Sequence, residues 1–177
     1  TDVCGNETTV SQTITVQDTT APTFTNPAPA DVTVECNAVP TAPTLSATDT
    51  CGNATVTFNE VRTDGSCASD YILTRTWTAT DICGNATSVS QIITVKDSTA
   101  PTFTSTAPAN VTVECNAVPT AATLAATDTC GNATVTFNEV RTDGSCASDY
   151  TLTRTWTATD VCGNATSVSQ IITVKDS

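Results

Sequence analysis

Four cysteines recur in this chain at a constant interval of 79 residues, and this repeat constrains the fold more than any other feature. Aligning residues 18–96 with residues 97–175 leaves eight differences, so 71 of the 79 positions are identical. Residues 1–17 match residues 80–96 and are predicted to be the C-terminal strand of a preceding, truncated repeat. We therefore expect two domains, at residues 18–96 and 97–177, in a piece of a longer array. The recurring cysteines are Cys36, Cys51, Cys67 and Cys83, followed by Cys115, Cys130, Cys146 and Cys162.

Each repeat alternates apolar with polar residues in short runs that end at turn-forming residues, which predicts β-strands. The clearest run is 71–80, where Tyr71, Leu73, Trp77 and Ala79 share one face. Arg75 interrupts that apolar face, and we expect its guanidinium to reach an edge. Shorter strands are expected at 31–36, 45–48, 54–61 and 88–95. We predict an all-β fold of tandem antiparallel immunoglobulin-like β-sandwich domains, disulfide-stapled, with about seven strands each.

Composition excludes several classes of function. Six basic residues against eighteen acidic ones give a net charge of −12, which would repel a nucleic-acid backbone. No apolar run approaches the roughly 20 residues that a transmembrane helix needs. The chain has no histidine, so histidine-based catalysis is excluded, and nothing distinguishes the acids Glu60, Asp64 and Asp70 from solvated carboxylates. We therefore predict that the protein is not an enzyme and requires no cofactor.

The cysteine spacing favours disulfides over zinc. Zinc knuckles place their cysteines about two to four residues apart, whereas the separations within each repeat are 15, 16 and 16. Following the chain through a meander of strands places the first cysteine with the third and the second with the fourth. The predicted bonds are Cys36–Cys67, Cys51–Cys83, Cys115–Cys146 and Cys130–Cys162, with Cys4 unpaired. Disulfides also predict an extracytoplasmic, oxidising location.

The motif Asp-x-Cys-Gly-Asn recurs, and two interpretations of it stay open. It is typical of a tight turn, in which Asp caps its own backbone, Gly takes positive φ and Asn tolerates the left-handed region. Alternatively, the carboxylates gather at the junction of two repeats and hold a structural Ca²⁺, which prefers oxygen ligands. The candidate calcium ligands are Asp18, Asp49, Asp81, Asp97, Asp128 and Asp160.

Short acceptor triplets for glycans are also present. Asp18-Thr19-Thr20 and Asp97-Ser98-Thr99 are similar to the Asp-Ser/Thr-x acceptor for O-glycans in Bacteroidetes, so Thr19 and Ser98 are candidate glycosylation sites. Asn-x-Thr triplets begin at Asn6, Asn53, Asn85, Asn110, Asn132 and Asn164, but a chain rich in Thr and Asn forms such triplets by chance.

The order of motifs resembles a known family over the whole chain. The motifs are Asp-Thr-Thr-Ala-Pro-Thr-Phe at 18–24, Val-Thr-Val-Glu-Cys at 32–36, Ala-Thr-Asp-Thr-Cys-Gly-Asn at 47–53 and Trp-Thr-Ala-Thr-Asp-Ile-Cys-Gly-Asn at 77–85. They resemble the HYR-like, immunoglobulin-like repeats of large cell-surface adhesins of Bacteroidetes, including the filamentous adhesins of gliding motility. The resemblance implies an extracellular β-sandwich, and the Asp-linked junction is similar to that of calcium-bound repeats in giant bacterial adhesins. It also implies an alternative disulfide pairing, Cys36–Cys51, Cys67–Cys83, Cys115–Cys130 and Cys146–Cys162.

Near-identical tandem copies favour a structural role over a catalytic one, for which one active site would suffice. We therefore expect a stalk that spaces an adhesive tip from the cell, with neighbouring repeats of the same chain as its partners. The alternative is a multivalent module that binds surface glycans or polymers, or contacts other filament subunits. An exposed aromatic platform would favour this alternative, but Trp77 and Trp156 are predicted to lie in the core.

Overall fold

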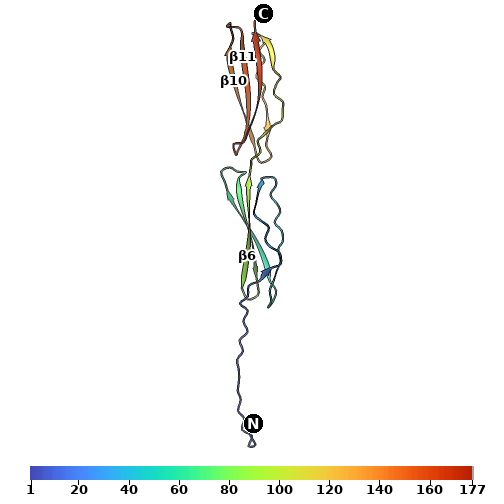
Figure 1. Ribbon diagram of the computed structural model, residues 1–177, viewed down its shortest axis with the longest axis vertical. Coiled ribbons are helices and arrows are strands. Elements are labelled where there is room, and N and C mark those ends of the chain that lie inside the picture. Colours follow the sequence, from blue (N-terminus) through green and yellow to red (C-terminus); the bar gives the residue numbers. More distant parts are fainter. Residues whose placement is uncertain (177) are drawn as a thin grey trace. The chain divides into compact units, whose positions relative to one another are not determined.

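The computed structural model describes residues 1–176 and is all-β, with two tandem β-sandwich-like repeats (Figure 1). The first repeat contains β1 (Thr23–Phe24), β2 (Val32–Glu35), β3 (Ala47–Thr48), β4 (Thr55–Asp64), β5 (Tyr71–Thr80) and β6 (Ala86–Lys96). The second contains β7 (Thr102–Phe103), β8 (Val111–Glu114), β9 (Ala126–Thr127), β10 (Ala133–Asp143), β11 (Tyr150–Asp160) and β12 (Ala165–Lys175). The structure thus has six strands per repeat within residues 1–176 and includes a two-residue strand at Thr23–Phe24 that the sequence pattern did not reveal.

The chain forms two compact units whose limits cut across the first repeat. One unit comprises Thr1–Ala28, Thr44–Phe58 and Trp77–Val89, and the other comprises Pro29–Pro43, Asn59–Thr76 and the chain from Ser90 onward. The second unit therefore contains the second repeat together with the adjoining part of the first. The division of the sequence at residues 18–96 and 97–177 stays a prediction, and the site described below lies within this second unit.

A four-stranded and a two-stranded sheet form each repeat. In the second repeat the strand order is β10-β11-β12-β8, and β7 pairs separately with β9. Strands β10, β11 and β12 are antiparallel, with Phe137 opposite Trp156 and Trp156 opposite Val168. The short strand β8 instead runs parallel to β12, as β2 does to β6, so the expected antiparallel sheet is mixed. Because β8 and β12 are far apart in sequence, no hairpin forces them to be antiparallel.

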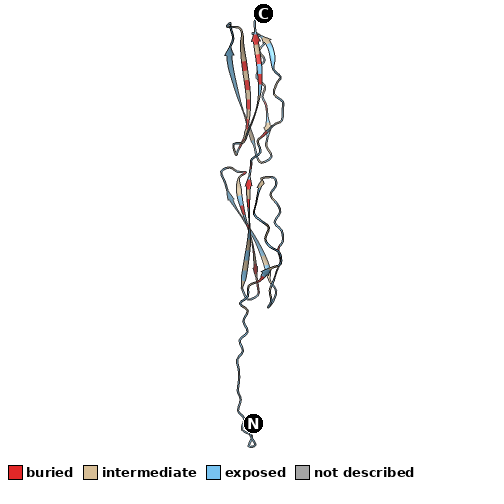
Figure 2. Ribbon diagram, viewed as in Figure 1, coloured by how far each residue is buried: buried red, intermediate tan, exposed pale blue. Residues whose placement is uncertain are grey.

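Alternation along β11 and β12 creates the core of the second repeat (Figure 2). Leu152, Trp156 and Ala158 point into the core, and Trp156 is only 1% exposed. The threonines between them remain partly exposed, as a half-buried strand of period two requires. The corresponding prediction for β5 is confirmed, since Leu73, Trp77 and Ala79 are buried and Ile72 is exposed.

The arginine that interrupts this face is itself buried. In the second repeat, the Arg154 side chain is 5% exposed and its Nε lies 2.6 Å from Oε2 of Glu139 on the outer strand β10. Its Nη2 also donates to the Pro119 carbonyl at 2.8 Å. Arg75 repeats this arrangement with Glu60 and the Pro40 carbonyl. The guanidinium therefore extends toward the edge strand, as expected, but it stays buried and pairs with a carboxylate that is 35% exposed.

Candidate structural site at the repeat junction

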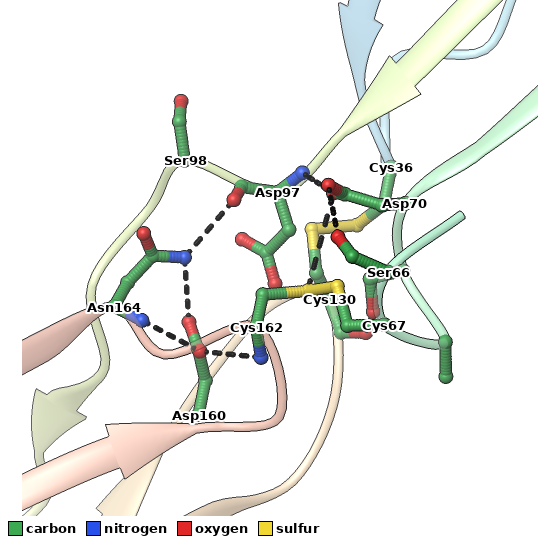
Figure 3. The surroundings of a disulfide bond; sticks show 12 residues. Cys36, Ser66, Cys67, Asp70, Asp97, Ser98, Cys130, Asp160, Cys162 and Asn164 are labelled. Carbon is green, nitrogen blue, oxygen red and sulfur yellow. Dashed lines mark hydrogen bonds between the residues drawn. A yellow bond between two sulfur atoms is a disulfide. The ribbon is translucent and has the colours of Figure 1, made fainter.

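Two disulfides join the repeats within the second compact unit (Figure 3). Cys36 is bonded to Cys130 with a Cα–Cα distance of 5.7 Å, and Cys67 is bonded to Cys162 with a distance of 5.2 Å. Cys36 follows β2 and Cys67 precedes β5, so both lie at the Lys96 end of the first repeat. Their partners follow β9 and β11 at the beginning of the second repeat. Each bond therefore connects the end of one repeat to the start of the next.

This connectivity corrects the predicted pairing. Neither Cys36–Cys67 nor Cys130–Cys162 forms, and the alternatives Cys36–Cys51, Cys67–Cys83, Cys115–Cys130 and Cys146–Cys162 do not form either. The meander argument grouped Cys36 with Cys67 at one end of a sandwich, but it assumed that partners share a sandwich. Within the described chain, Cys4, Cys51, Cys83, Cys115 and Cys146 are free and exposed, so the predicted bonds Cys51–Cys83 and Cys115–Cys146 are also absent.

The motif that contains Cys162 forms a closed turn, visible in Figure 3. One Asp160 carboxylate oxygen accepts from the backbone N–H groups of Cys162 (2.8 Å) and Asn164 (2.9 Å). The other accepts from the Asn164 side-chain amide, which also donates to the Asp97 carbonyl at 3.0 Å. Burial alone would raise the pKa of Asp160, but these hydrogen bonds lower it below its ordinary value. This carboxylate is therefore ionised and held by the turn.

The turn interpretation is thus partly confirmed. Asp81 and Asp2 cap their turns in the same way, and Gly5, Gly84 and Gly163 all have positive φ. Gly52 and Gly131, in the motifs at Asp49 and Asp128, do not have positive φ, so the prediction is wrong for those two copies. The Asn, however, is not left-handed, since no described residue other than glycine has positive φ. Its contribution is the side-chain amide that closes the turn on Asp.

The motif at Asp128 leaves one carboxylate oxygen without a partner. Asp128 Oδ1 accepts from the Cys130 backbone N–H at 2.7 Å, but its buried Oδ2 has no hydrogen bond. Asp97 is 7% exposed, and its Oδ2 is likewise buried without a partner. Carboxylate oxygens of Asp97, Asp128 and Asp160 lie within 4.8 Å of one another. Burial raises the pKa of Asp97, and the negative charges of Asp128, Asp160 and Glu35 raise it further.

The other predicted ligands gather less completely. In the first compact unit, Asp18 and Asp49 approach each other together with the Cys51 sulfur, and Asp49 Oδ2 is buried without a partner. Asp81 is not part of that group, although its turn with Asn85 matches the turn that Asp160 forms with Asn164. Three of the six predicted ligands therefore form an all-carboxylate cluster in the part of the chain that the structure describes.

Hydrogen bonds that the sequence did not reveal also fasten the junction. The Asp97 backbone N–H donates to Asp70 Oδ1 at 2.9 Å, and the buried Ser69 hydroxyl donates to the Cys130 carbonyl at 2.6 Å. Ser98 donates through both its backbone N–H and its hydroxyl to the Glu35 carboxylate. One feature of the sequence could have indicated a role for Ser69 and Asp70 at the junction: they follow Cys67 closely and stand immediately before a strand.

The candidate glycosylation residues lie on exposed segments. Thr19 and Ser98 are both exposed, and the Ser98 hydroxyl is engaged by Glu35. Glycosylation at either residue stays a prediction.

Among residues 1–176, we find no helix that is long and apolar enough to cross a membrane.

Comparison with known proteins identifies the class. The architecture of tandem, disulfide-linked β-sandwiches defines an array of repeat domains. Residues 24–95 and 103–174 each match the HYR-like domain with four cysteines, and the chain belongs to this family. Repeat domains of this kind are typically non-catalytic. None of the curated proteins compared with the chain matches it.

Two solved structures to which the chain is similar are only remotely like it. Drosophila N-cadherin EC1-4 is 13% identical over 89% of this chain and 50% of its own, with a TM-score of 0.37. The human mucin-like protocadherin EC1-2 is 14% identical over 88% of this chain and 98% of its own, with a TM-score of 0.35. The chain thus spans half of that N-cadherin fragment. At such TM-scores, neither likeness supports an argument about function.

Proposed function

We propose that this chain is a structural stalk segment of a large extracellular adhesin, which spaces an adhesive tip from the cell that bears it. The observation that carries this proposal is the pair of disulfides between consecutive repeats. Disulfides persist in oxidising compartments, which supports an extracellular location. Large bacterial surface adhesins, such as the gliding-motility adhesins of Bacteroidetes, are the setting that the motifs favour.

The junction has the properties that a spacer needs. Its linker, residues 96–101, contains no glycine, so its backbone has few accessible conformations. Two covalent bonds and the hydrogen bonds from Asp97 and Ser98 restrict it further. A repeat held at several points cannot swivel about a single linker, so a force applied to one repeat is transmitted to the next.

Alignment of the two repeats in solution tests this coupling. Residual dipolar couplings of the oxidised chain should give one alignment tensor for strands of both repeats. Replacing Cys36, Cys67, Cys130 and Cys162 by serine should give two different tensors. The matched control replaces the counterparts Cys115, Cys146, Cys51 and Cys83, which are free, and should retain one tensor. Two tensors in the oxidised parent chain would contradict the stalk proposal.

The junction carboxylates support a second element of the proposal, a structural Ca²⁺ held by Asp97, Asp128 and Asp160. Calcium takes several oxygen ligands, and this cluster offers three carboxylates. The unpartnered Oδ2 atoms of Asp97 and Asp128 fit such an ion, because burying negative charge without a counterion is costly. The ion would neutralise repulsion at the junction and order the linker that carries Asp97.

Calorimetry with CaCl₂ tests this site. The oxidised chain should bind Ca²⁺, and Asp128→Asn should reduce the bound ion by one equivalent per chain. Glu7→Gln, in the exposed N-terminal segment, is the control and should leave binding unchanged. The calcium proposal is refuted if titration produces no heat and chelation leaves the melting temperature of the parent chain unchanged.

The alternative role, multivalent binding of glycans, has less support. Trp77 and Trp156 are each 1% exposed, so neither forms an aromatic platform for a sugar ring. Specific retention of this two-repeat chain on a glycan array would nevertheless replace the stalk by a binding module.

A further inference from the structure

The free cysteines are the sequence counterparts of the bonded ones. Cys115 and Cys146 lie 79 residues after Cys36 and Cys67, which form the bonds at the end of the first repeat. Cys51 and Cys83 lie 79 residues before Cys130 and Cys162, which complete those bonds at the start of the second. Four of the five free cysteines therefore form two pairs by position. Cys115 and Cys146 lie at the end of the second repeat, Cys51 and Cys83 lie at the start of the first, and Cys4 stands outside both pairs.

The second repeat reproduces the surroundings of the bonded pair at its own C-terminal end. Asp149 Oδ1 accepts from the Asp176 backbone N–H at 3.2 Å, as Asp70 Oδ1 accepts from Asp97 at 2.9 Å. The Asp149 backbone N–H donates to the Cys146 carbonyl at 3.1 Å, a distance that Asp70 and Cys67 repeat. The turn that presents Cys146 thus has the geometry found at the bonded junction.

The first repeat likewise reproduces the complementary surroundings at its N-terminal end. The Cys51 backbone N–H donates to Asp49 Oδ1 at 2.8 Å, and its counterpart Cys130 donates to Asp128 at 2.7 Å. The Asn85 side chain donates to the Asp18 carbonyl at 3.2 Å, which matches Asn164 and Asp97. Both turns that present Cys51 and Cys83 have therefore adopted the geometry found at the bonded junction.

We call the C-terminal end of the second repeat and the N-terminal end of the first repeat half-junctions. Some of their residues are more exposed than the counterparts at the complete junction. Ile82 is 88% exposed, whereas its counterpart Val161 is 52% exposed. Ser69 is buried at the junction, but its counterpart Ser148 is only half-buried. At Ser69 the difference arises from the following repeat, because its hydroxyl donates to the Cys130 carbonyl there and the sequence around Ser148 is identical.

We propose that both ends of this chain are half-sites for further copies of the same repeat, and that every junction in such an array carries the same two disulfides. Cys115 and Cys146 bond to the counterparts of Cys130 and Cys162 in a copy that follows. Cys51 and Cys83 bond to the counterparts of Cys36 and Cys67 in a copy that precedes. The partner copy belongs either to the same polypeptide or to a second chain, and the chemistry is the same in both cases.

Each bond forms by exchange with a low-molecular-weight disulfide such as oxidised glutathione. One thiolate attacks that disulfide and releases one glutathione thiol, and the partner thiolate then attacks the mixed disulfide and releases the second. Two protein thiols thus lose two protons and two electrons, which the oxidant takes up.

An extended chain tests the proposal. Appending residues 99–175 after Ser177 adds a complete third repeat, because the chain ends with the same Asp-Ser that begins the second. Both chains are refolded in glutathione buffer, alkylated without reduction and mapped by peptide mass spectrometry. The parent chain should carry label on its five free cysteines. The extended chain should also carry five labels, with Cys115 and Cys146 bonded to the appended copy and no longer among them.

A serine variant of the extended chain serves as the control. Replacing the appended counterparts of Cys130 and Cys162 by serine should leave Cys115 and Cys146 labelled. Covalent oligomers in which Cys115 is bonded to Cys51 of another chain would support the half-sites with a second chain as partner. Labelled Cys115 and Cys146 in the extended chain, or a bond between them, would overturn the proposal. Such a failure would leave the stalk role open, because the coupling at the existing junction is measured separately.

Discussion

Removing the Cys36–Cys130 bond should destabilise the oxidised chain substantially. The two cysteines are 94 residues apart. With Cys67–Cys162 intact, the shortest loop that the bond closes contains about 60 residues, for which the chain-entropy relation gives about 4 kcal/mol. In a chain of this length, that loss corresponds to a decrease in melting temperature of about 10 °C. The variant is Cys36→Ser together with Cys130→Ser, which leaves no reactive thiol at the site.

The repeat supplies an exact control for this experiment. Cys115→Ser together with Cys51→Ser changes the counterparts of the same two residues, both of which are exposed and free. The free energy of unfolding of this variant should lie within about 0.5 kcal/mol of the parent value. Thermal and guanidinium unfolding, followed by circular dichroism under non-reducing conditions, measure both variants. Equal losses of stability in the two variants would refute the reasoning. That result is expected if the disulfides form within each repeat, because each variant would then break the same number of bonds.

Four further substitutions probe the second repeat. Glu139→Gln leaves the buried guanidinium of Arg154 without a counter-charge and should cost about 2 kcal/mol, whereas Arg154→Met leaves a carboxylate that is 35% exposed to water and should cost about 1 kcal/mol. Urea unfolding measures both variants, and the opposite order would contradict the burial argument. Gly163→Ala should cost about 1 kcal/mol, since Gly163 has φ of +93°. Gly131→Ala, where an added Cβ makes ordinary contacts, should change the melting temperature little, and equal losses would argue against the turn geometry.

The sequence predicted the longer strands because each carries its own pattern of alternating residues, whereas the two-residue strand Thr23–Phe24 is too short to show one. The alternation at 71–80 identified the buried face of Trp77, and a 79-residue period identified the repeat. It also predicted that Asp97, Asp128 and Asp160 would gather, since all three adjoin the junction. The disulfide partners were predicted wrongly, because spacing within one repeat cannot reveal which repeat supplies the second sulfur. Ser69 and Asp70 were missed because their partners lie in the following repeat, and sequence periodicity reports only local structure.

The overlap of the two disulfide loops has a consequence for a chain exposed to proteases. One loop runs from Cys36 to Cys130 and the other from Cys67 to Cys162, so they share the segment between Cys67 and Cys130. A protease that cuts one peptide bond anywhere between Cys36 and Cys162 leaves two fragments that are still covalently joined. The linker at residues 96–101 lies within both loops, so its cleavage would not detach one repeat from the other.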